Sequence, residues 1–514
     1  MSRRLLLLPV VALASLAFAL PAQAVPNLLA VSKRPLGPAA ARRLLAQSGA
    51  RSISSLGSRR IFLVKGTTAV RLAATHVFSS ISHDRVLSRL DAPTPLPPAW
   101  ANASWWLQPS DGISTFGIGA TGIWDRALNA AGVTLVGVVD SGIDLNHPDL
   151  VSALWTNPQE VAGNGLDDDA NGYADDVHGY DFLAGNADIQ DAFGHGTHVA
   201  GIITGTGGVA PSEARLIIAR TGGSDDEISV SAAIQGIEYT AQRGARVINC
   251  SWGGPGDIPA LSQAIADAGR LGALVVVAAG NEGKSEAAIA DFPAMDGLPN
   301  ELAVAASDQQ GQLASFSSYG PGVDLAAPGV NILSDWLSGG QMVLSGTSMA
   351  TPMVSGVAAL LFSIDPLATP SEVRRAILKS ASPLAGLAGS KTSAGLLNAP
   401  AALYALEHPD PLPAVSGYSA RKAQLFDVKS PAKLKWKGKV IGQVRGAGAH
   451  RFSWKPISDP ELEAYRLFLD GQIVAVVPKT QTSLSLLVDF GQHSWHVVGQ
   501  DYSGQEIAAQ PETP

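Results

Sequence analysis

The chain has 514 residues, of which 46% are hydrophobic and 16% are charged, and its net charge is −8. This length and apolar content allow a large core and more than one domain. The mild negative charge argues against a nucleic-acid partner, because such proteins present clustered positive charge. A single cysteine, Cys250, excludes an intramolecular disulfide.

The N-terminus has the pattern of a secretory signal peptide over residues 1–24. Ser2-Arg3-Arg4 is a basic start, residues 5–20 are apolar, and Ala22-Gln23-Ala24 is a small-x-small cleavage pattern. We expect a secreted protein, with the periplasm or cell surface as further options. A membrane anchor is the alternative, but Pro9 interrupts the apolar run, which is short for a bilayer span. We expect no later membrane-spanning segment.

Residues 25–98 differ in composition, being rich in Ala, Arg and Ser, and they end in a Pro-rich joint that includes Pro97 and Pro98. The segment has room for a small α+β domain. We expect a strand at residues 61–64 and a short helix within residues 85–90. A disordered spacer is the alternative.

Residues 99–409 alternate short apolar strands with helical stretches. Strands are expected at 133–139, 215–219, 247–249 and 274–279, and helices at 231–242, 259–271, 348–362 and 370–379. The last helix begins at Thr369-Pro370, a suitable cap and first-turn proline. This alternation predicts an α/β fold with a mostly parallel sheet covered by helices on both faces.

Residues 410–514 follow a second Pro-rich joint and contain only strand patterns. The expected strands are 451–454, 465–469, 472–477, 483–488 and 494–498, and Asp470-Gly471 is a turn signal between two of them. The region predicts a linker followed by a β-sandwich of about 60–100 residues.

Three separate segments carry reactive side chains. Asp140 ends the expected strand 133–139, where α/β sheets place active-site residues, although an isolated Asp there is usually a cap or a solvated loop residue. His195 lies in Gly194-His195-Gly196-Thr197-His198 at the start of a helix; metal ligation with His198 or core packing are alternatives. Ser348, in Gly346-Thr347-Ser348-Met349-Ala350, opens a long apolar helix, and alone it would be interpreted as an N-cap.

Taken together, these residues favour nucleophilic catalysis. A serine hydroxyl needs a base to take its proton, and a histidine base needs a carboxylate to fix its tautomer. The chain supplies Asp140, His195 and Ser348 in the order Asp, His, Ser, which is the subtilisin order. All three segments closely resemble the signature motifs of the subtilisin-like serine proteases over about residues 100–404. The resemblance implies a serine endopeptidase that acts on polypeptides, with no organic cofactor and expected as a monomer.

The resemblance also assigns roles in substrate binding. Ala278-Ala279-Gly280-Asn281 is similar to the family's oxyanion segment, so Asn281 and the Ser348 N–H are expected to bind the oxyanion; an Asn in a turn before Gly283 is the alternative. Ser251-Trp252-Gly253-Gly254 resembles the edge strand that pairs with the substrate backbone. The expected substrate-binding residues are Ser251, Trp252, Gly253, Ala278, Ala279, Gly280, Glu282 and Asp291.

Two acids in that set bear on specificity. The resemblance puts Glu282 near the rim of the primary specificity pocket and Asp291 near its base. An acid at the base could favour Arg or Lys before the scissile bond. A solvated loop acid is the alternative interpretation.

Residues 164–176 form an acidic loop that predicts a calcium site. Asp167, Asp169, Asn171 and Gly172 match the start of an EF-hand loop, with Tyr173 and Asp175 at the seventh and ninth positions, but His178 stands where the final Glu is needed. A solvated acidic loop is the alternative. Related enzymes resemble this chain in carrying a calcium-binding acidic insertion here. The resemblance adds Asp149 as a further calcium ligand, although the companion loop is not evident.

The resemblance assigns the outer segments as well. Residues 25–98 look like a family propeptide, which assists folding and inhibits the enzyme until it is cleaved; the mature start is expected between residues 90 and 115. The C-terminal region resembles a fibronectin type III-like sandwich. Cys250 does not match the reactive thiol of some relatives and is expected to be a small buried residue.

Two other functions remain open from the sequence. The peptidase domain could be a scaffold for surface binding, which an intact set of Asp140, His195, Ser348 and Asn281 argues against. Alternatively, the acyl-enzyme could be transferred to an amine instead of to water, as in peptide-processing relatives.

Overall fold

The computed structural model describes residues 27–408, with gaps at 58–59, 90–91, 94–104, 110–115, 131, 225–226, 286–287, 289–290, 385 and 388–391, and the strands of the C-terminal region. The expected signal peptide, residues 1–24, and most of both Pro-rich joints lie outside the described residues.

A parallel sheet of seven strands forms the centre of the molecule, in the order β16-β15-β13-β11-β7-β9-β8. The strands are β7 (Thr134–Asp140), β8 (Gly179–Asp181), β9 (Ala214–Arg220), β11 (Val247–Cys250), β13 (Leu274–Ala278), β15 (Glu301–Ser307) and β16 (Leu325–Pro328). All six pairings between them are parallel. The predicted α/β class and its four strands in this region are therefore confirmed.

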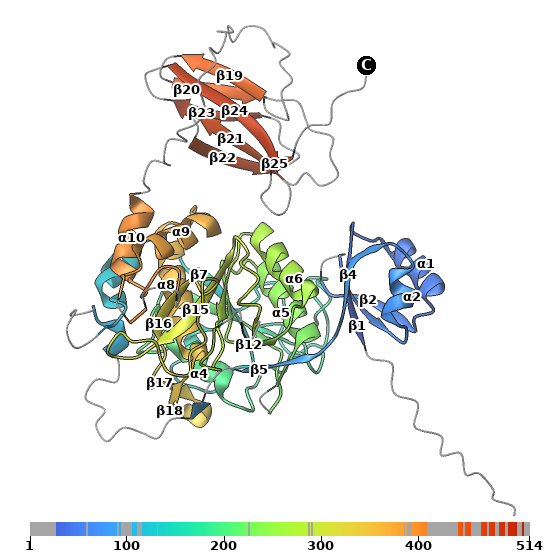
Figure 1. Cartoon of the computed structure of the whole chain (residues 1–514), viewed down its shortest axis with the longest axis horizontal. Coiled ribbons are helices and arrows are strands. Elements are labelled where there is room, and N and C mark those ends of the chain that lie inside the picture. The colour runs from blue at the N-terminus through green and yellow to red at the C-terminus, as the bar shows by residue number, and fades with distance from the viewer. Residues whose placement is uncertain are drawn as a thin grey trace, which may run out of the picture.

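Helices cover both faces of this sheet (Figure 1). α4 (His195–Thr204) and α8 (Thr347–Ile364) lie on one face, and α5 (Val230–Gln242) and α6 (Pro259–Arg270) on the other. Alternate side chains of β13 enter the two cores, because successive strand residues point to opposite faces: Val276 packs on the α8 side, and Val275 and Val277 on the α6 side.

α8 is long and apolar enough to cross a membrane by length and composition, which the sequence analysis did not anticipate. However, 94% of it is buried inside the molecule, as expected of a core helix. α9 (Pro370–Ser380) follows and begins with a capping box, in which Glu372 N donates to Thr369 Oγ1 and Thr369 N donates to Glu372 Oε2. The remaining helices of the larger unit are α3 (Trp124–Leu128) and α10 (Ala399–Glu407).

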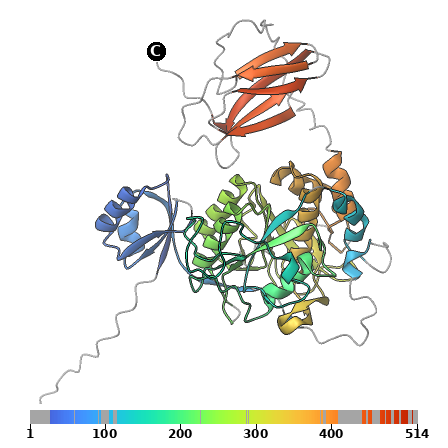
Figure 2. The same cartoon turned by 180° about the vertical axis from the view of Figure 1, so that it is seen from behind.

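The N-terminal segment folds as a four-stranded antiparallel sheet with two helices. Its strands, in the order β2-β3-β1-β4, are β1 (Leu28–Ser32), β2 (Ser52–Ser55), β3 (Ile61–Lys65) and β4 (Phe78–His83), and its helices are α1 (Pro38–Ser48) and α2 (Ala69–Ala73). The sheet packs against α5 and α6 of the larger unit, as both views show (Figures 1 and 2). Leu29, Val31 and Leu56 share one apolar cluster with Leu261 and Ile265 of α6.

The predicted short helix within residues 85–90 is wrong. This segment is strand β5 (Val86–Arg89), which pairs antiparallel with β10 (Glu227–Ser229) on one side and with β12 (Trp252–Pro255) on the other. The segment is extended because strands of the larger unit on both sides form hydrogen bonds with its backbone N–H and C=O groups. Local propensity cannot anticipate such long-range pairing. β14 (Asp291–Phe292) completes this small sheet.

Past β5, the chain forms the two-residue strand β6 (Ala92–Pro93). β6 pairs with β18 (Gly340–Ser345), which also pairs with β17 (Ile332–Trp336). Since Ser345 lies opposite Ala92 and is three residues before Ser348, β6 lies close to the start of α8 in the chain's pairing with β18.

The C-terminal strands form two antiparallel sheets, one containing β19-β24-β21-β22 with β25, and the other β20-β23. Their bounds are β19 (Val440–Arg445), β20 (Gly448–Ser453), β21 (Ala464–Leu469), β22 (Gln472–Pro478), β23 (Ser483–Val488), β24 (Gln492–Gln500) and β25 (Glu506–Ile507). The strand-only pattern is thus confirmed among the described residues.

Candidate active site

The structure brings Asp140 and His195 into direct contact. Asp140 ends β7 at the centre of the sheet, and His195 begins α4. The Asp140 Oδ1 to His195 Nδ1 distance is 2.8 Å, and both side chains are fully buried. Ser141 N also donates to Asp140 Oδ1 at 2.7 Å. A buried carboxylate at this position fixes the imidazole tautomer and stabilises its protonated form.

A glycine sets the start of α4. Gly194 has φ = 105° and lies against the Trp336 ring, where a Cβ atom would approach to 2.5 Å. Gly196 N donates to Ser141 Oγ at 2.9 Å, tying the first turn of α4 to the end of β7. The small residues around His195 therefore allow the close approach of helix and strand that the Asp140 contact requires.

Ser348 lies in the first turn of α8, next to the residue that follows β11. Ser348 Oγ donates to the Ser251 carbonyl at 2.8 Å, and Ser251 Oγ donates to the Ser348 carbonyl at 3.0 Å. Because α8 packs against α4 and β11 is the neighbour of β7, this arrangement holds Ser348 on the same edge of the sheet as Asp140 and His195.

Asn281 is fixed three residues beyond the end of β13. Thr347 N and Thr347 Oγ1 both donate to Asn281 Oδ1, each at 3.0 Å. Since the amide oxygen is held in this way, Asn281 Nδ2 is the end available to donate. It belongs to a side chain anchored one residue away from Ser348, where an oxyanion donor is needed.

His198 has a different environment from His195. Its Nε2 lies 3.1 Å from the Met342 carbonyl, and its ring meets Trp336 edge-on. Burial lowers the pKa of His198 to about 3, so the ring is neutral at physiological pH. His195 contacts Asp140, whereas His198 contacts the Met342 carbonyl. These separate partners do not support the alternative in which both histidines bind one metal ion.

A chain segment already occupies the predicted substrate strand. Ser88 lies opposite Gly253 and Arg89 opposite Trp252. Leu87 is buried and packs on Gly254, where a Cβ atom would lie 3.0 Å from its side chain. Trp252 itself is held by its Nε1, which donates to the Val139 carbonyl at 2.7 Å. β12 thus binds an extended peptide through its backbone.

The two pocket acids converge on Gly280, beside buried Ala278 and Ala279. A Cβ atom on Gly280 would lie 2.2 Å from Asp291 Oδ2 and 2.7 Å from Glu282 Oε2. Asp291 is 3% exposed, whereas Glu282 is exposed and accepts a hydrogen bond from Ser318 Oγ at 2.9 Å. Burial, and secondly Glu282, raise the pKa of Asp291 to about 7.

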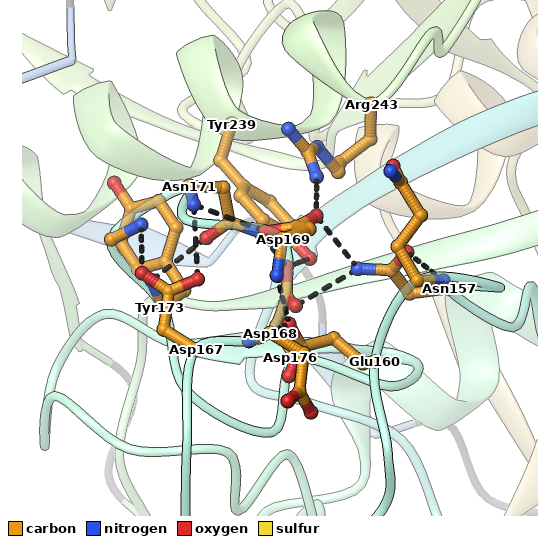
Figure 3. A network of polar contacts seen from close by, with 12 residues as sticks. Asn157, Glu160, Asp167, Asp168, Asp169, Asn171, Tyr173, Asp176, Tyr239 and Arg243 are labelled. Atoms are coloured by element: carbon orange, nitrogen blue, oxygen red, sulfur yellow. Dashed lines mark hydrogen bonds and ion pairs between the residues drawn. The ribbon is translucent and has the colours of Figure 1, made fainter.

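The acidic loop is cross-linked by its own carboxylates (Figure 3). Asp167 accepts from Asn171 N and Gly172 N, and Asp175 accepts from Asn164 N and Gly165 N. In Asn171, Oδ1 accepts from Tyr173 N, and Nδ2 donates to Asp176 Oδ2. Oxygens of Asp167, Asn171 and Asp175 thus accept hydrogen bonds from backbone N–H groups of the loop.

Three other carboxylates in this region do converge. Ligand atoms of Glu160, Asp169 and Asp176 lie within 4.8 Å of one another, so they could hold a metal ion. Arg243 Nη1 binds Asp169 Oδ2 at 2.6 Å, leaving two negative charges uncompensated by that cation. The sequence analysis named Asp169 but missed Glu160 and Asp176 as ligands. Asp176 lies in the acidic stretch, but nothing local marks Glu160, which precedes it.

Asp149 lies in a second such group, with His147 and Asp335 of β17. His147 Nε2 lies 3.9 Å from Asp335 Oδ1 and 3.0 Å from the Gly340 carbonyl. Asp335 is far from Asp149 in sequence, which is why the sequence analysis missed it.

Cys250 is free and fully buried at the end of β11. Burial, followed by the nearby Asp140 charge, raises the pKa of its thiol well above the usual value. A thiol in this state is a poor nucleophile, in agreement with the prediction of a small buried residue.

Comparisons with known proteins agree with this geometry. Residues 132–400 match the family model described as the subtilase family. The chain is 38% identical to subtilisin BL of Lederbergia lenta over 286 residues, covering 54% of this chain and 93% of that protein. It is 36% identical to thermitase of Thermoactinomyces vulgaris over 283 residues (54% and 90%) and 39% identical to M-protease of Shouchella clausii over 286 residues (54% and 66%).

Proposed function

The chain belongs to the subtilase family and is a serine endopeptidase, and on that premise we propose that Asp140, His195 and Ser348 are its catalytic triad. The observation that carries this assignment is the 2.8 Å contact between buried Asp140 and His195, on the sheet edge where Ser348 opens α8. A buried serine at a helix N-terminus alone would be an ordinary cap.

In the proposed reaction, His195 Nε2 takes the proton of Ser348 Oγ as the oxygen attacks the substrate carbonyl carbon. The imidazolium, stabilised by Asp140, then gives that proton to the leaving amine, and the peptide C–N bond breaks. In the second half, His195 takes a proton from water as the water oxygen attacks the acyl carbon. The ester bond to Ser348 Oγ then breaks, the imidazolium returns the proton to Oγ, and the product is released with its new carboxyl group. Asn281 Nδ2 and Ser348 N–H donate to the oxyanion in both halves.

The N-terminal unit, the part of residues 25–98 that precedes the cut, acts as an intramolecular inhibitor that the enzyme removes itself. The support is the pairing of β5 with β12, which fills the substrate strand with the chain's own backbone. Arg89, the last residue of β5, lies opposite Trp252, and the neighbouring Ser251 carbonyl accepts a hydrogen bond from Ser348 Oγ. Self-cleavage is therefore expected between Leu90 and Asp91, giving a mature chain that begins at Asp91.

The acidic loop binds a structural Ca²⁺ in this proposal. Glu160, Asp169 and Asp176 fit a divalent cation, because hard carboxylate oxygens converge and Arg243 balances only one of the three charges. Asp167, Asn171, Tyr173 and Asp175 hold the loop in shape. The ion would take no part in the chemical step. With no disulfide available, it would replace a covalent cross-link in a secreted enzyme.

The C-terminal region is proposed to be a fibronectin type III-like sandwich, a module separate from catalysis. Its support is the two antiparallel sheets formed by β19 to β25. Secretion is supported by the signal-peptide pattern at residues 1–24.

The test compares the wild-type chain with Ser348→Ala by intact mass, followed by a casein digest. Wild type should lose its N-terminal unit, begin at Asp91 and cleave casein, whereas Ser348→Ala should remain joined and inactive. If both proteins are processed alike and neither differs in casein cleavage, the triad assignment fails. If they are processed alike but only the wild type cleaves casein, another protease performs the cut and the triad assignment stands. Product analysis with an added amine separates hydrolysis from transfer.

A further inference from the structure

We propose that Asp291, at the base of the primary specificity pocket, and Glu282, at its rim, share one proton, and that the pocket binds Lys or Arg by releasing that proton. This inference rests on the proposed function, because it requires β12 and residues 278–280 to bind the substrate. It adds a specificity mechanism that depends on pH.

The position of the pair follows from the backbone. Asp291 begins β14 and lies opposite Pro255, at the end of β12. β12 binds the extended segment at Gly253, and Gly280 leads directly to Asn281, the proposed oxyanion donor. The two carboxyl groups therefore lie beside Gly280. Gly280 itself lies between the proposed peptide-binding strand and the proposed position of the reacting carbonyl group.

The two carboxyl groups can lie here because Gly280 has no side chain. Its Cα faces Asp291 Oδ2, Glu282 Oε2 and Ser318 Oγ, all of which would lie within 2.9 Å of a Cβ atom. Its φ of 105° also disfavours other residues. The space a side chain would fill is therefore occupied by polar atoms.

Asp291, the buried residue of the pair, has one carboxyl oxygen with no hydrogen-bond partner among the described residues. Asp291 is 3% exposed, and its Oδ2 accepts no hydrogen bond from a described N–H or hydroxyl group. Glu282 is exposed at the rim and already accepts from Ser318 Oγ. Two carboxylates this close cannot both ionise easily, so one proton remains between them. The pKa of Asp291 is about 7, so its carboxyl group keeps the proton below that pH and adds a negative charge above it.

Among the described residues, Glu282 is the charged neighbour that affects Asp291. Residues 252–255 of β12 carry no ionisable side chain, and the described part of the segment after β13 adds Glu282 and the exposed Lys284. The segment that carries Ser318 also lies beside Gly280, and its next residue, Tyr319, is ionisable. Burial and Glu282 are the causes of the raised pKa of Asp291, in that order.

The substrate consequence is a proton exchange. An ammonium or guanidinium group entering the pocket pairs with both carboxylates, and the Asp291 proton leaves to solvent. Binding a cation therefore becomes easier as pH rises through about 7, the pKa of Asp291. An apolar side chain such as leucine exchanges no proton, so its binding lacks this dependence. Self-cleavage after Leu90 is compatible with the singly charged pair.

The experiment uses the processed enzyme and two peptides that differ only in Lys or Leu before the scissile bond. The ratio of their kcat/KM values cancels the ionisation of His195, which both reactions share. In the wild type, this ratio should rise about tenfold between pH 6 and pH 8, because one proton is released. In Asp291→Asn the ratio should be flat, and in Glu282→Gln the rise should move to lower pH.

Asp296→Asn is the matched control. Burial also raises the pKa of Asp296 to about 7, but its neighbours are Ser262 and Asp257, outside the pocket. This variant should keep the wild-type rise. A flat ratio in the wild type, or a rise that survives in Asp291→Asn, would overturn the acid pair. If Asp291→Asn fails to fold, Glu282→Gln, at an exposed position, carries the same test.

The Leu peptide separates this inference from the proposed function. If it is cleaved normally while the ratio is flat, the acid pair is wrong and the peptidase assignment stands. If neither peptide is cleaved by the processed wild-type enzyme, the proposed function itself has failed.

Discussion

At the scale of single residues, the site depends on side chains that are held rigidly by the backbone around them. Asn281 is the clearest case, since Thr347 binds its amide oxygen twice from the residue next to Ser348. A donor fixed in advance stabilises the developing oxyanion without the cost of reorganising at the moment of reaction.

Asn281→Ala should therefore lower kcat by about 10²–10³ with little change in KM, the magnitude established for the oxyanion asparagine of subtilisin itself. Thr347→Val should show a smaller loss, because Thr347 N still holds the amide oxygen. Steady-state kinetics on one peptide measures both. A change confined to KM would instead make Asn281 a substrate-binding residue.

The sequence predicts residues well where a motif gathers them locally, as for Asp140, His195 and Ser348. It fails for groups assembled by tertiary contact. Asp335 joins His147 and Asp149 from the other half of the chain, and Glu160 joins Asp169 and Asp176 because the loop folds back. The alternating acids at 167–171 suggested an EF-hand loop, but backbone N–H groups engage several of those carboxylates instead.

At the scale of elements, the apolar runs of residues 133–139, 247–249 and 274–279 were sufficient to predict a parallel sheet, since buried strands of this kind lack polar alternation. β5 was not predictable in the same way, because its extended form comes from β10 and β12, which lie far along the chain. The conformation of such a segment is determined by its pairing partners and not by its local propensity.

The acidic loop is the element whose stability should respond to a metal ion. Burial raises the pKa of Asp176, so its ionised form is unfavourable unless a cation or hydrogen bonds compensate; Tyr239 Oη donates one at 2.7 Å. Calcium at about 100 times its Kd should stabilise the processed enzyme by about 2.7 kcal/mol, and EDTA should remove this gain.

Thermal unfolding with and without calcium measures that effect. Asp176→Asn should lose the response, while Asp168→Asn, at an exposed position outside the converging group, should keep it. Equal melting temperatures of the wild type in calcium and in EDTA would exclude this site.

At the scale of the whole molecule, the N-terminal unit makes three kinds of contact with the larger one. It shares an apolar cluster with α5 and α6, it inserts β5 between β10 and β12, and it accepts a hydrogen bond from the first turn of α5. That acceptor is Asp84 Oδ1, which binds Ser231 N at 3.2 Å, beside the helix's own N-cap Ser229. Each contact would outlast cleavage of the chain, because none needs the peptide bond.

Asp84→Ala should therefore speed release of the cleaved N-terminal unit. Losing one hydrogen bond costs about 1 kcal/mol, so the lag before peptide hydrolysis should shorten about fivefold. Val70→Ala is the control, since Val70 is 80% exposed on the N-terminal unit. Intact mass shows whether cleavage itself is unchanged. An unaltered lag in Asp84→Ala would mean that the hydrogen bond from Ser231 N to Asp84 does not help to retain the cleaved N-terminal unit.

The position of β5 also determines how activity would spread through a population of molecules. Under the proposed self-cleavage, each chain would make the first cut on itself, so the rate of that cut would not depend on dilution. The cleaved unit would then stay bound as a product until it dissociates. Once a few molecules become free, they can digest the inhibitors released by others, so activation would follow a sigmoidal course whose steep phase arrives sooner in concentrated samples.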